Sequence, residues 1–185
     1  MNLNRYAVKG KDGRTAILRP AEETDAPFIL QAVEEIIRSG VFIQKEQKRT
    51  LDKEKEFIRE MKEKGNLYAV VELDGKAAGI ARVIKGELAM KRHTGLYRTW
   101  LSERASGVGF GREILNYTLD WCRNERLHKL CLTVFASNEI AVRLYEKNGF
   151  VIEGIQKEQV LLNGRFDDEI YMARFFNKQN KNAVL

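Results

Sequence analysis

A glycine-rich stretch, Arg104-Ala-Ser-Gly-Val-Gly-Phe-Gly111, carries the strongest chemical signal in the sequence. It follows a strand-like run and opens a helix-like one, so its backbone N–H groups would lie at the positive end of a helix dipole. Glycines let a backbone approach a bound anion closely, and the pattern therefore predicts a phosphate site. The alternative is that Gly107, Gly109 and Gly111 form only a tight turn.

Two common phosphate-binding motifs do not fit this stretch. A Walker A motif needs a Lys and a Ser or Thr after its second glycine, whereas Arg112-Glu113 follows Gly111. The dinucleotide fingerprint needs a third glycine at the position of Arg112. Both motifs are therefore excluded.

A second block, Asn138-Glu-Ile-Ala-Val-Arg-Leu-Tyr-Glu-Lys-Asn-Gly-Phe150, lies downstream. Together with Arg104-x-x-Gly107-x-Gly109, it resembles the GNAT superfamily of acyl-CoA-dependent N-acyltransferases. That family carries (Gln/Arg)-x-x-Gly-x-(Gly/Ala) in its pyrophosphate loop and Asn-x-x-Ala-x-x-Leu-Tyr-x-x-x-Gly-Phe further on. The resemblance covers residues 15–176, and the segment 163–168 looks most like the branch of spermidine and ribosomal-protein N-terminal acetyltransferases.

The resemblance implies that acetyl-CoA is the cosubstrate and that loop N–H groups hold its pyrophosphate, with added charge from Arg104 and Arg112. It also implies that the pantetheine arm lies between strands ending near Leu101 and Phe135. Asn138 would hydrogen-bond this arm, and the alternative is a plain helix cap. The implied cosubstrate-binding residues are Trp100, Leu101, Ser102, Arg104, Ser106, Gly107, Val108, Gly109, Phe110, Gly111, Arg112, Asn138 and Tyr145.

The resemblance assigns the catalytic role to Tyr145, which matches the family tyrosine that protonates the departing CoA thiolate. The spacing of Tyr145 alone favours an aromatic residue in the core face of its helix, and only the surrounding motif reverses that preference. The implied reaction is direct attack of a neutral primary amine on the thioester within a ternary complex. Strand N–H groups near Trp100 would stabilise the oxyanion.

The general base departs from the family pattern. Many relatives carry a Glu on the strand before the loop, but Gly95-Leu-Tyr-Arg-Thr-Trp-Leu101 contains no carboxylate. A water chain to Glu34, Glu35 or Glu87, or an amine that arrives neutral, would replace the base. The third alternative is a non-catalytic acyl-CoA-binding sensor or interaction module.

The acceptor amine stays open between a polyamine, a protein N-terminus and another small amine. A polyamine would need an acidic pocket, whereas a peptide would need an open groove between the first two helices and the final hairpin. The resemblance also allows a homodimer. The acidic candidates are Glu34, Glu35, Asp167, Asp168 and Glu169.

Hydrophobic periodicity predicts the elements that must position these residues. They follow the order β-α-α-β-β-β-α-β-α-β-β, with hairpin turns at Asp74-Gly75 and Asn163-Gly164. Thr24 is expected to cap the first helix, which would end near Gly40. The predicted strands are 15–19, 67–73, 76–84, 95–101, 129–135, 150–162 and 165–176. We expect one α/β domain over residues 1–176, with a mixed, mostly antiparallel central sheet flanked by helices, and a flexible polar tail over 177–185.

Composition narrows the function classes. The chain has 185 residues and a net charge of +6, but Lys and Arg are interleaved with Glu, which argues against nucleic-acid binding. The run Lys45–Lys64 is expected to be a solvated helix face. No apolar run reaches the roughly 20 residues of a membrane span, and the N-terminus lacks a secretory signal, so we expect a cytoplasmic protein.

Other catalytic and metal chemistries lack their residues. Cys122 and Cys131 are expected to be buried thiols, and His93 and His128 to lie at the surface. No adequate ligand set for a metal is present. No Gly-x-Ser-x-Gly motif supports a serine hydrolase.

Overall fold

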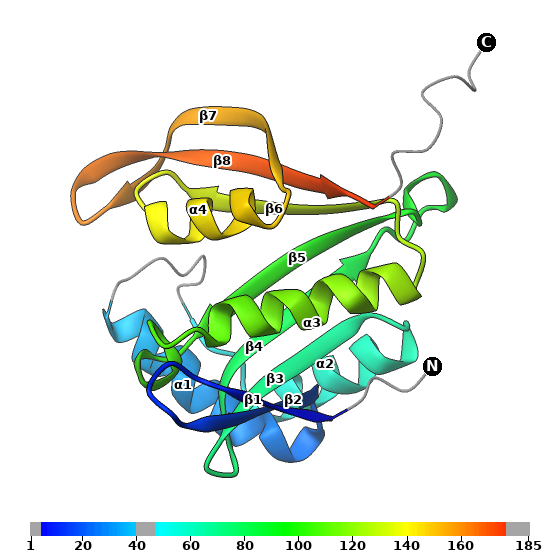
Figure 1. Cartoon of the computed structure of the whole chain (residues 1–185), viewed down its shortest axis with the longest axis vertical. Coiled ribbons are helices and arrows are strands. Elements are labelled where there is room, and N and C mark those ends of the chain that lie inside the picture. The colour runs from blue at the N-terminus through cyan, green and yellow to red at the C-terminus, as the bar shows by residue number, and fades with distance from the viewer. Residues whose placement is uncertain (1–4, 40–46, 177–185) are drawn as a thin grey trace. The chain divides into compact units, whose positions relative to one another are not determined.

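A computed structural model describes residues 5–39 and 47–176 of the protein, which form two compact units (Figure 1). Unit 1 contains the described residues up to Ile84 together with Tyr97–Trp121. Unit 2 contains Lys85–Leu96 and the described residues from Cys122 onward. The predicted helix end near Gly40 and the predicted tail over 177–185 lie outside the described residues.

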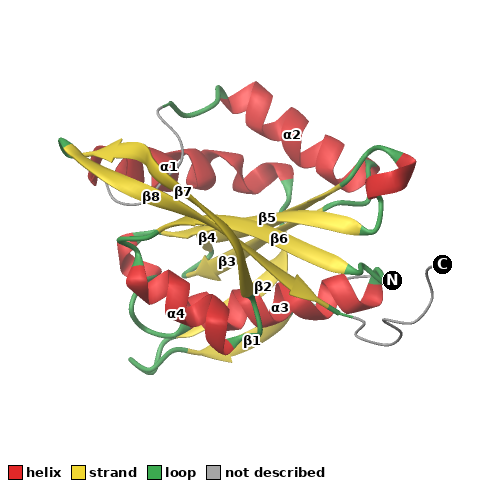
Figure 2. Cartoon of the chain, turned by 90° about the horizontal axis from the view of Figure 1, so that it is seen from above, coloured by secondary structure: helices red, strands yellow, loops and turns green. Residues whose placement is uncertain are grey.

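Unit 1 is a sheet with helices on both faces. Its strands β1 to β4 pair antiparallel in chain order. Figure 2 shows α1 and α2 on one face of these strands and α3 on the other. Its elements are β1 (Tyr6–Lys9), β2 (Thr15–Pro20), α1 (Ala26–Ser39), α2 (Leu51–Glu63), β3 (Leu67–Leu73), all but the last residue of β4 (Lys76–Lys85), the second half of β5 (Thr94–Leu101) and most of α3 (Phe110–Asn124).

Unit 2 is built around a long hairpin. Strand β6 (Lys129–Phe135) pairs parallel with Thr94–Leu96 of β5 and antiparallel with β8 (Arg165–Phe175). Strand β7 (Val151–Leu162) pairs with β8 and forms the edge of this unit's sheet. The helix α4 (Glu139–Lys147) joins β6 to β7.

The strand order is β1-β2-β3-β4-β5-β6-β8-β7, a mixed and mostly antiparallel sheet. The predicted α/β class and the order of the predicted elements are confirmed. The described residues contain one strand more than predicted, because β1 was missed. This strand has only four residues, mostly exposed, and too few for a clear alternation.

Both predicted hairpin turns are confirmed. Asp74 and Gly75 have φ angles of 52° and 74°, and Asn163 and Gly164 have 50° and 77°. Two successive positive φ angles define the type I′ turn, which matches the twist of the strands it connects. These turns fix the registers Leu73 opposite Lys76 and Leu162 opposite Arg165.

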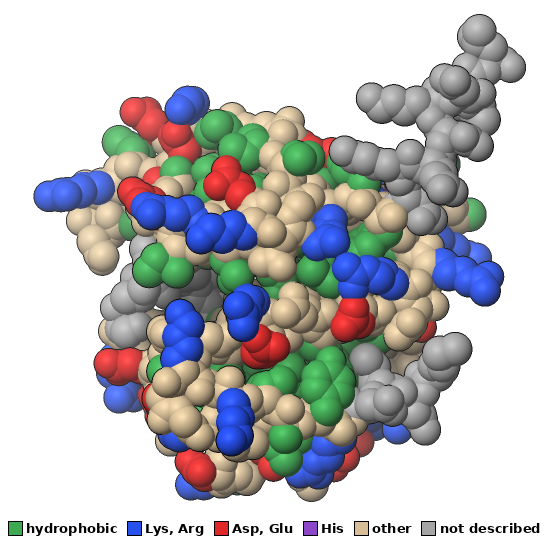
Figure 3. All heavy atoms as spheres, viewed as in Figure 1, with side chains coloured by type: hydrophobic (Ala, Val, Ile, Leu, Met, Phe, Trp, Pro, Cys, Tyr) green, Lys and Arg blue, Asp and Glu red, His purple; other side chains and the backbone are tan. Residues whose placement is uncertain are grey.

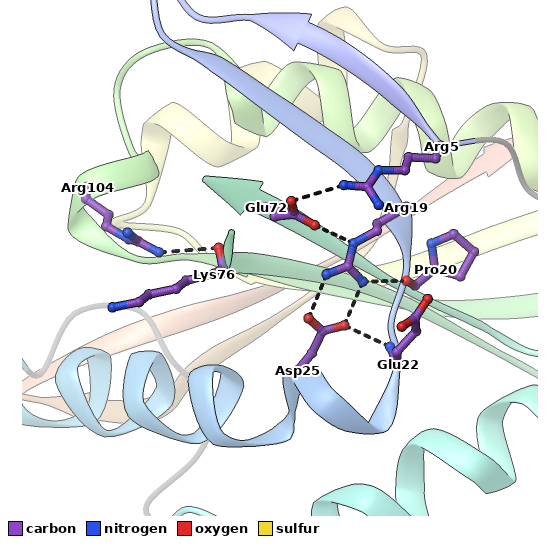
Figure 4. Close-up of polar contacts among 8 residues, drawn as sticks. All are labelled: Arg5, Arg19, Pro20, Glu22, Asp25, Glu72, Lys76 and Arg104. Atoms are coloured by element: carbon purple, nitrogen blue, oxygen red, sulfur yellow. Dashed lines mark hydrogen bonds and ion pairs between the residues drawn. The ribbon is translucent and has the colours of Figure 1, made fainter. Parts of the chain in front are cut away.

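The start of the first helix differs from the prediction. Thr24 is not the cap, because a short 3-10 turn, Glu23–Asp25, precedes α1 and the Asp25 carboxylate accepts from the Glu22 N–H at 2.8 Å. Figure 4 shows Asp25 also bound to Arg19, whose Nη1 and Nη2 both lie 2.7 Å from the carboxylate oxygens. A charged carboxylate that accepts hydrogen bonds from both Arg19 and Glu22 holds the start of the helix more strongly than the Thr24 hydroxyl would.

The prediction that the charged residues of Lys45–Lys64 form a solvated helix face is wrong at Glu54. Glu54 of α2 has a side chain only 1% exposed. Its carboxylate accepts from the Tyr68 hydroxyl at 2.6 Å and from Arg49 at 2.9 Å. The surrounding core between α1, α2 and the sheet contains Ala26, Ile29, Val33, Ile58, Met61, Tyr68, Val70, Ala77 and Ile80.

The interleaved charge and the buried Cys122 follow the sequence expectations, whereas Cys131 was expected to be buried and is only half-buried. Figure 3 shows Lys and Arg side chains scattered among Asp and Glu on the face in view. Cys122 is buried and Cys131 half-buried, both are free, and burial raises the pKa of the Cys122 thiol to about 12. Across residues 5–39 and 47–176, no helix is both long enough and apolar enough to span a membrane.

Candidate active site

The glycine stretch forms a loop between β5 and α3 in unit 1. A short 3-10 turn, Glu103–Ala105, follows β5, and α3 begins at Phe110. Gly107 and Gly109 have φ angles of 76° and 99°, a backbone region that other residues rarely adopt. A Cβ added to Gly107 would have no heavy atom within 4 Å, so the backbone here faces open space.

The loop offers unpaired donors at a helix N-terminus. Among the described residues, no protein acceptor receives the N–H groups from Gly107 to Gly111. The next two N–H groups, of Arg112 and Glu113, donate to the Gly109 carbonyl at 3.1 and 3.4 Å. Consecutive free donors at the positive end of a 15-residue helix are suited to a pyrophosphate, so these residues fit the phosphate end of acetyl-CoA.

The turn between β1 and β2 braces this loop, which the sequence analysis did not predict. The Lys11 N–H donates to the Val108 carbonyl at 2.8 Å, and Arg14 Nη2 donates to the Arg104 carbonyl at 2.7 Å. Arg14 is itself held by Asp12 at 2.5 Å. The glycine-bearing segment Gly10-Lys-Asp-Gly13 was the available signal, because it is a turn sequence that could have revealed the missed hairpin.

We expect Arg14→Gln to weaken acetyl-CoA binding by roughly fivefold, because a charge-assisted hydrogen bond that holds the loop is lost. Calorimetric titration with acetyl-CoA measures the change in Kd. The matched control is Arg5→Gln, which removes an exposed arginine from the same hairpin that pairs with Glu72 and not with the loop. Equal affinities of the two variants would contradict the bracing role.

The charged side chains of the loop are partly engaged. Figure 4 shows Arg104 donating to the Lys76 carbonyl, at 3.4 Å. The Arg112 side chain is 66% exposed and forms an ion pair with Glu113 at 3.0 Å, which partly compensates its positive charge. The Ser106 hydroxyl donates to the Ser102 carbonyl at 3.0 Å. Direct contacts of Arg104, Arg112 and Ser106 with acetyl-CoA stay predictions.

The expectation of a free backbone at Ser102 needs correction. Its N–H donates to the Ala78 carbonyl at 2.8 Å, and its carbonyl accepts from the Ala105 N–H at 2.9 Å. The Ser102 hydroxyl is buried and has no partner among the described residues. Pairing of the pantetheine amides therefore stays a prediction for Trp100 and Leu101, and Ser102 offers only its hydroxyl.

Asn138 and Tyr145 belong to unit 2. The Asn138 side-chain oxygen caps α4 by accepting from the Ala141 N–H at 3.2 Å. For this oxygen, the helix-cap alternative is therefore correct. Tyr145 is 7% exposed and its ring centroid lies 5.5 Å from that of Phe150. Both roles in acetyl-CoA binding or catalysis stay predictions, and the remaining predicted site residues, from Trp100 to Arg112, lie together in unit 1.

Of the candidate replacement bases, Glu34 is paired with a lysine, and Glu35 and Glu87 are exposed. Lys48 lies 2.5 Å from Glu34 and holds the pKa of that carboxyl below its usual range, which weakens it as a base. Glu35 is exposed and accepts from Gln31 at 3.1 Å. Glu87 is exposed as well.

The acidic candidates of the final hairpin are also engaged. Asp167 accepts from the Ser137 hydroxyl at 2.5 Å, and Asp168 pairs with Lys157 at 2.8 Å. The bond to Lys157 lowers the pKa of the Asp168 carboxyl. Asp167 and Asp168 therefore each have a partner within the chain.

The two histidines lie at the surface, as predicted. His93 and His128 are exposed, with their ring centroids 5.9 Å apart. Within the part of the chain that the structure describes, no three His, Cys, Asp or Glu residues come together as a metal site.

Residues 30–150 match the Acetyltransferase (GNAT) family, a stretch that contains both sequence blocks. The chain belongs to the GNAT family. The GNAT resemblance drawn from the glycine loop and from the block Asn138–Phe150 is thereby confirmed.

Several proteins similar to this chain are named N-acetyltransferases. It is 30% identical to the L-amino acid N-acetyltransferase of Escherichia coli over 103 residues, 55% of this chain and 64% of that protein. It is 41% identical to the spermidine N(1)-acetyltransferase of Vibrio cholerae over 76 residues, 40% of this chain and 42% of that protein. The matches thus span less than two thirds of either relative. The structure of a phosphinothricin acetyltransferase from Sinorhizobium meliloti in complex with acetyl-CoA shares the fold, with a TM-score of 0.80 at 21% identity over 88% of this chain and 89% of that one.

Proposed function

We propose that this GNAT chain is an acetyl-CoA-dependent N-acetyltransferase that transfers the acetyl group to a primary amine within a ternary complex. The observation that carries the proposal is the row of unpaired N–H groups from Gly107 to Gly111 at the N-terminus of α3. Such a row suits a pyrophosphate. The similar structure with bound acetyl-CoA supports the same cosubstrate.

In the proposed reaction, the glycine loop, strand β5 and Tyr145 have different roles. The glycine loop holds the pyrophosphate, and Trp100 and Leu101 offer strand backbone to the pantetheine arm. Acetyl-CoA supplies the activated acetyl group. Backbone N–H groups near Trp100 stabilise the oxyanion that forms when the amine attacks. Tyr145 protonates the departing thiolate.

The proton of the attacking amine needs another route, because β5 carries no carboxylate. Glu34 is unsuited, since Lys48 lowers its pKa. The proposal therefore has the amine enter in its neutral form. The proton that its nitrogen loses after the attack passes through water and replaces the one that Tyr145 gives to the thiolate. The same observation favours the second candidate function, an acyl-CoA-binding module without turnover.

Calorimetric titration with acetyl-CoA, alongside 3′-dephospho-CoA, tests the cosubstrate half of the proposal. Micromolar binding supports it, and absence of binding at high concentration would mean that the glycine loop is only a turn. Release of CoA is then followed for a panel of primary amines. Turnover of any amine separates the enzyme from the module without turnover.

We expect Tyr145→Phe to lower kcat about tenfold while changing the Kd of acetyl-CoA less than twofold, because the phenol acts only as the thiolate leaves. The measurement is steady-state turnover together with calorimetric titration. Tyr171→Phe is the matched control, since Tyr171 is 38% exposed and its hydroxyl donates to Gln156. Unchanged turnover in Tyr145→Phe would remove Tyr145 from the mechanism.

The proposal also includes an expected location and an expected oligomeric state. A cytoplasmic location and a homodimer follow from the sequence expectations and the family resemblance alone. Light scattering of the purified protein distinguishes a dimer from a monomer.

A further inference from the structure

A row of polar side chains crosses the sheet of unit 1. Tyr68 on β3 lies directly opposite Arg82 on β4. The bond from the Ser102 N–H to the Ala78 carbonyl, at 2.8 Å, sets β5 against β4, and counting back along this antiparallel pair places Arg98 opposite Arg82. These three residues therefore form one row across three strands.

The row lies on the sheet face that α1 and α2 cover. Residues two apart on a strand share a face. Val70 and Ile80, each two residues from a member of the row, belong to the core that these helices cover, and Trp100, two residues from Arg98, packs against that core. The row thus borders an apolar core, where charge is costly unless it is paired.

Phe57 of α2 adds an aromatic ring to the row, and Arg49, just before α2, adds a third arginine. The Cζ atoms of Arg49 and Arg82 lie 3.9 and 5.4 Å from the centroid of the Phe57 ring. The nearby carboxylate, Glu54, is already occupied, because it accepts from Arg49 at 2.9 Å and from Tyr68 at 2.6 Å.

The positive charge of Arg82 has no carboxylate paired with it among the described residues. Its side chain is half-buried, and no described residue forms a hydrogen bond or an ion pair with its guanidinium, whose contact is the Phe57 ring. Burial, followed by repulsion from Arg49 and Arg98, lowers the pKa of Arg82. A desolvated cation of this kind costs folding free energy, so its presence points to a ligand that compensates the charge.

We propose that Arg82, flanked by Arg49, binds a carboxylate of the acceptor, so that the acceptor is an amine that also carries a carboxylate. This inference rests on the proposed function and names its substrate class. The Arg82 guanidinium can hold a carboxylate through two parallel hydrogen bonds. A polyamine would meet like charge at this row.

The position of the row on the chain is compatible with an acceptor site. Arg98 precedes Ser102 by four residues, so it lies about 13 Å back along β5 from the start of the loop. A pantetheine arm that pairs with the β5 backbone would run in this direction, away from the pyrophosphate. The acceptor must approach the acetyl end of that arm.

The state of the acidic candidates for polyamine recognition also favours an acceptor that carries a carboxylate. Glu34 is paired with Lys48, Asp167 accepts from Ser137, and Asp168 is paired with Lys157. Their negative charge is thus already compensated or hydrogen-bonded within the chain. A carboxylate-bearing amine needs no such pocket, because the chain offers Arg82.

The test compares the L-amino acids with their α-amides, which differ only in the carboxylate. Binding to the CoA-saturated wild type is measured by calorimetry, so that the glycine loop is occupied. We expect at least one amino acid to bind about tenfold or more tighter than its amide, and Arg82→Gln to reduce this preference to about twofold or less. Wild-type protein without any such preference, or an Arg82→Gln variant that retains it, would overturn the proposal.

Controls separate ligand binding from folding. Arg143→Gln removes an exposed arginine that pairs with Glu139 and should keep the preference. In buffer without amino acids, Arg82→Gln should melt at the same temperature as the wild type or higher, because a desolvated cation is gone. A lower melting temperature would assign Arg82 a structural role and overturn the proposal. Failure of the proposed function is seen separately, as absence of acetyl-CoA binding, and the amino acid preference is then measured without CoA.

Discussion

Replacing Gly107 with alanine is expected to weaken acetyl-CoA binding by roughly 30-fold or more, equivalent to about 2 kcal/mol. A Cβ at this position would project into open space, with no heavy atom within 4 Å, beside the unpaired N–H groups. We assign this space to the pyrophosphate, so a methyl group there displaces the ligand and not a protein atom. Calorimetric titration measures the loss.

The strain of the substitution itself must be separated from the loss of ligand contacts. Gly164, in the β7–β8 turn, is the matched control, because its φ angle is 77° against 76° for Gly107 and a Cβ there also meets no atom within 4 Å. Both alanine variants should lose a similar stability of about 1 kcal/mol. Only Gly107→Ala should lose acetyl-CoA affinity, and equal affinities of the two variants would show that the loop does not hold the pyrophosphate.

The glycine loop could be predicted because its signal is local. Gly107 and Gly109 stand where a strand-like run meets a helix-like one, and their positive φ angles follow from that junction. The brace from Lys11 and Arg14 could not be found in the same way. It joins segments about 90 residues apart, such as Arg14 and Arg104, and depends on the short strand β1 that periodicity missed.

Tyr145 shows a different limit of sequence reasoning. Its position on the inner face of α4 satisfies the pattern of a core aromatic, and its 7% exposure agrees with that pattern. A catalytic phenol must also be shielded from bulk water, so burial does not separate the two roles. The motif around Tyr145 made the assignment, and turnover of the Tyr145→Phe variant decides it.

The error at Glu54 came from reading charge as exposure. Lys and Glu alternate along α2, and such alternation is usually a solvated surface. Burial of Glu54 is possible because of its partners Tyr68 and Arg49, which lie 14 and 5 residues away in the sequence. Both lie outside α2, so the charge pattern of this helix does not reveal them. Arg82 escaped attention for the same reason, because strand pairing alone brings it beside Tyr68.

Glu54→Ala is expected to lower the free energy of unfolding by about 3 kcal/mol, the cost of removing one partner of a buried ion pair. The substitution leaves the Tyr68 hydroxyl and the Arg49 guanidinium without their shared acceptor. Burial, followed by the charge of Glu54, raises the pKa of Tyr68 far above its ordinary value, so the hydroxyl stays protonated and needs an acceptor. Urea unfolding of the variant measures the change.

Two further variants identify the source of this loss. Glu56→Ala removes an exposed carboxylate two residues further along α2 and should change stability by less than about 0.5 kcal/mol. Tyr68→Phe removes only one of the two hydrogen bonds and should cost about 1 kcal/mol. A Glu54→Ala variant as stable as Glu56→Ala would mean that Glu54 does not stabilise the fold.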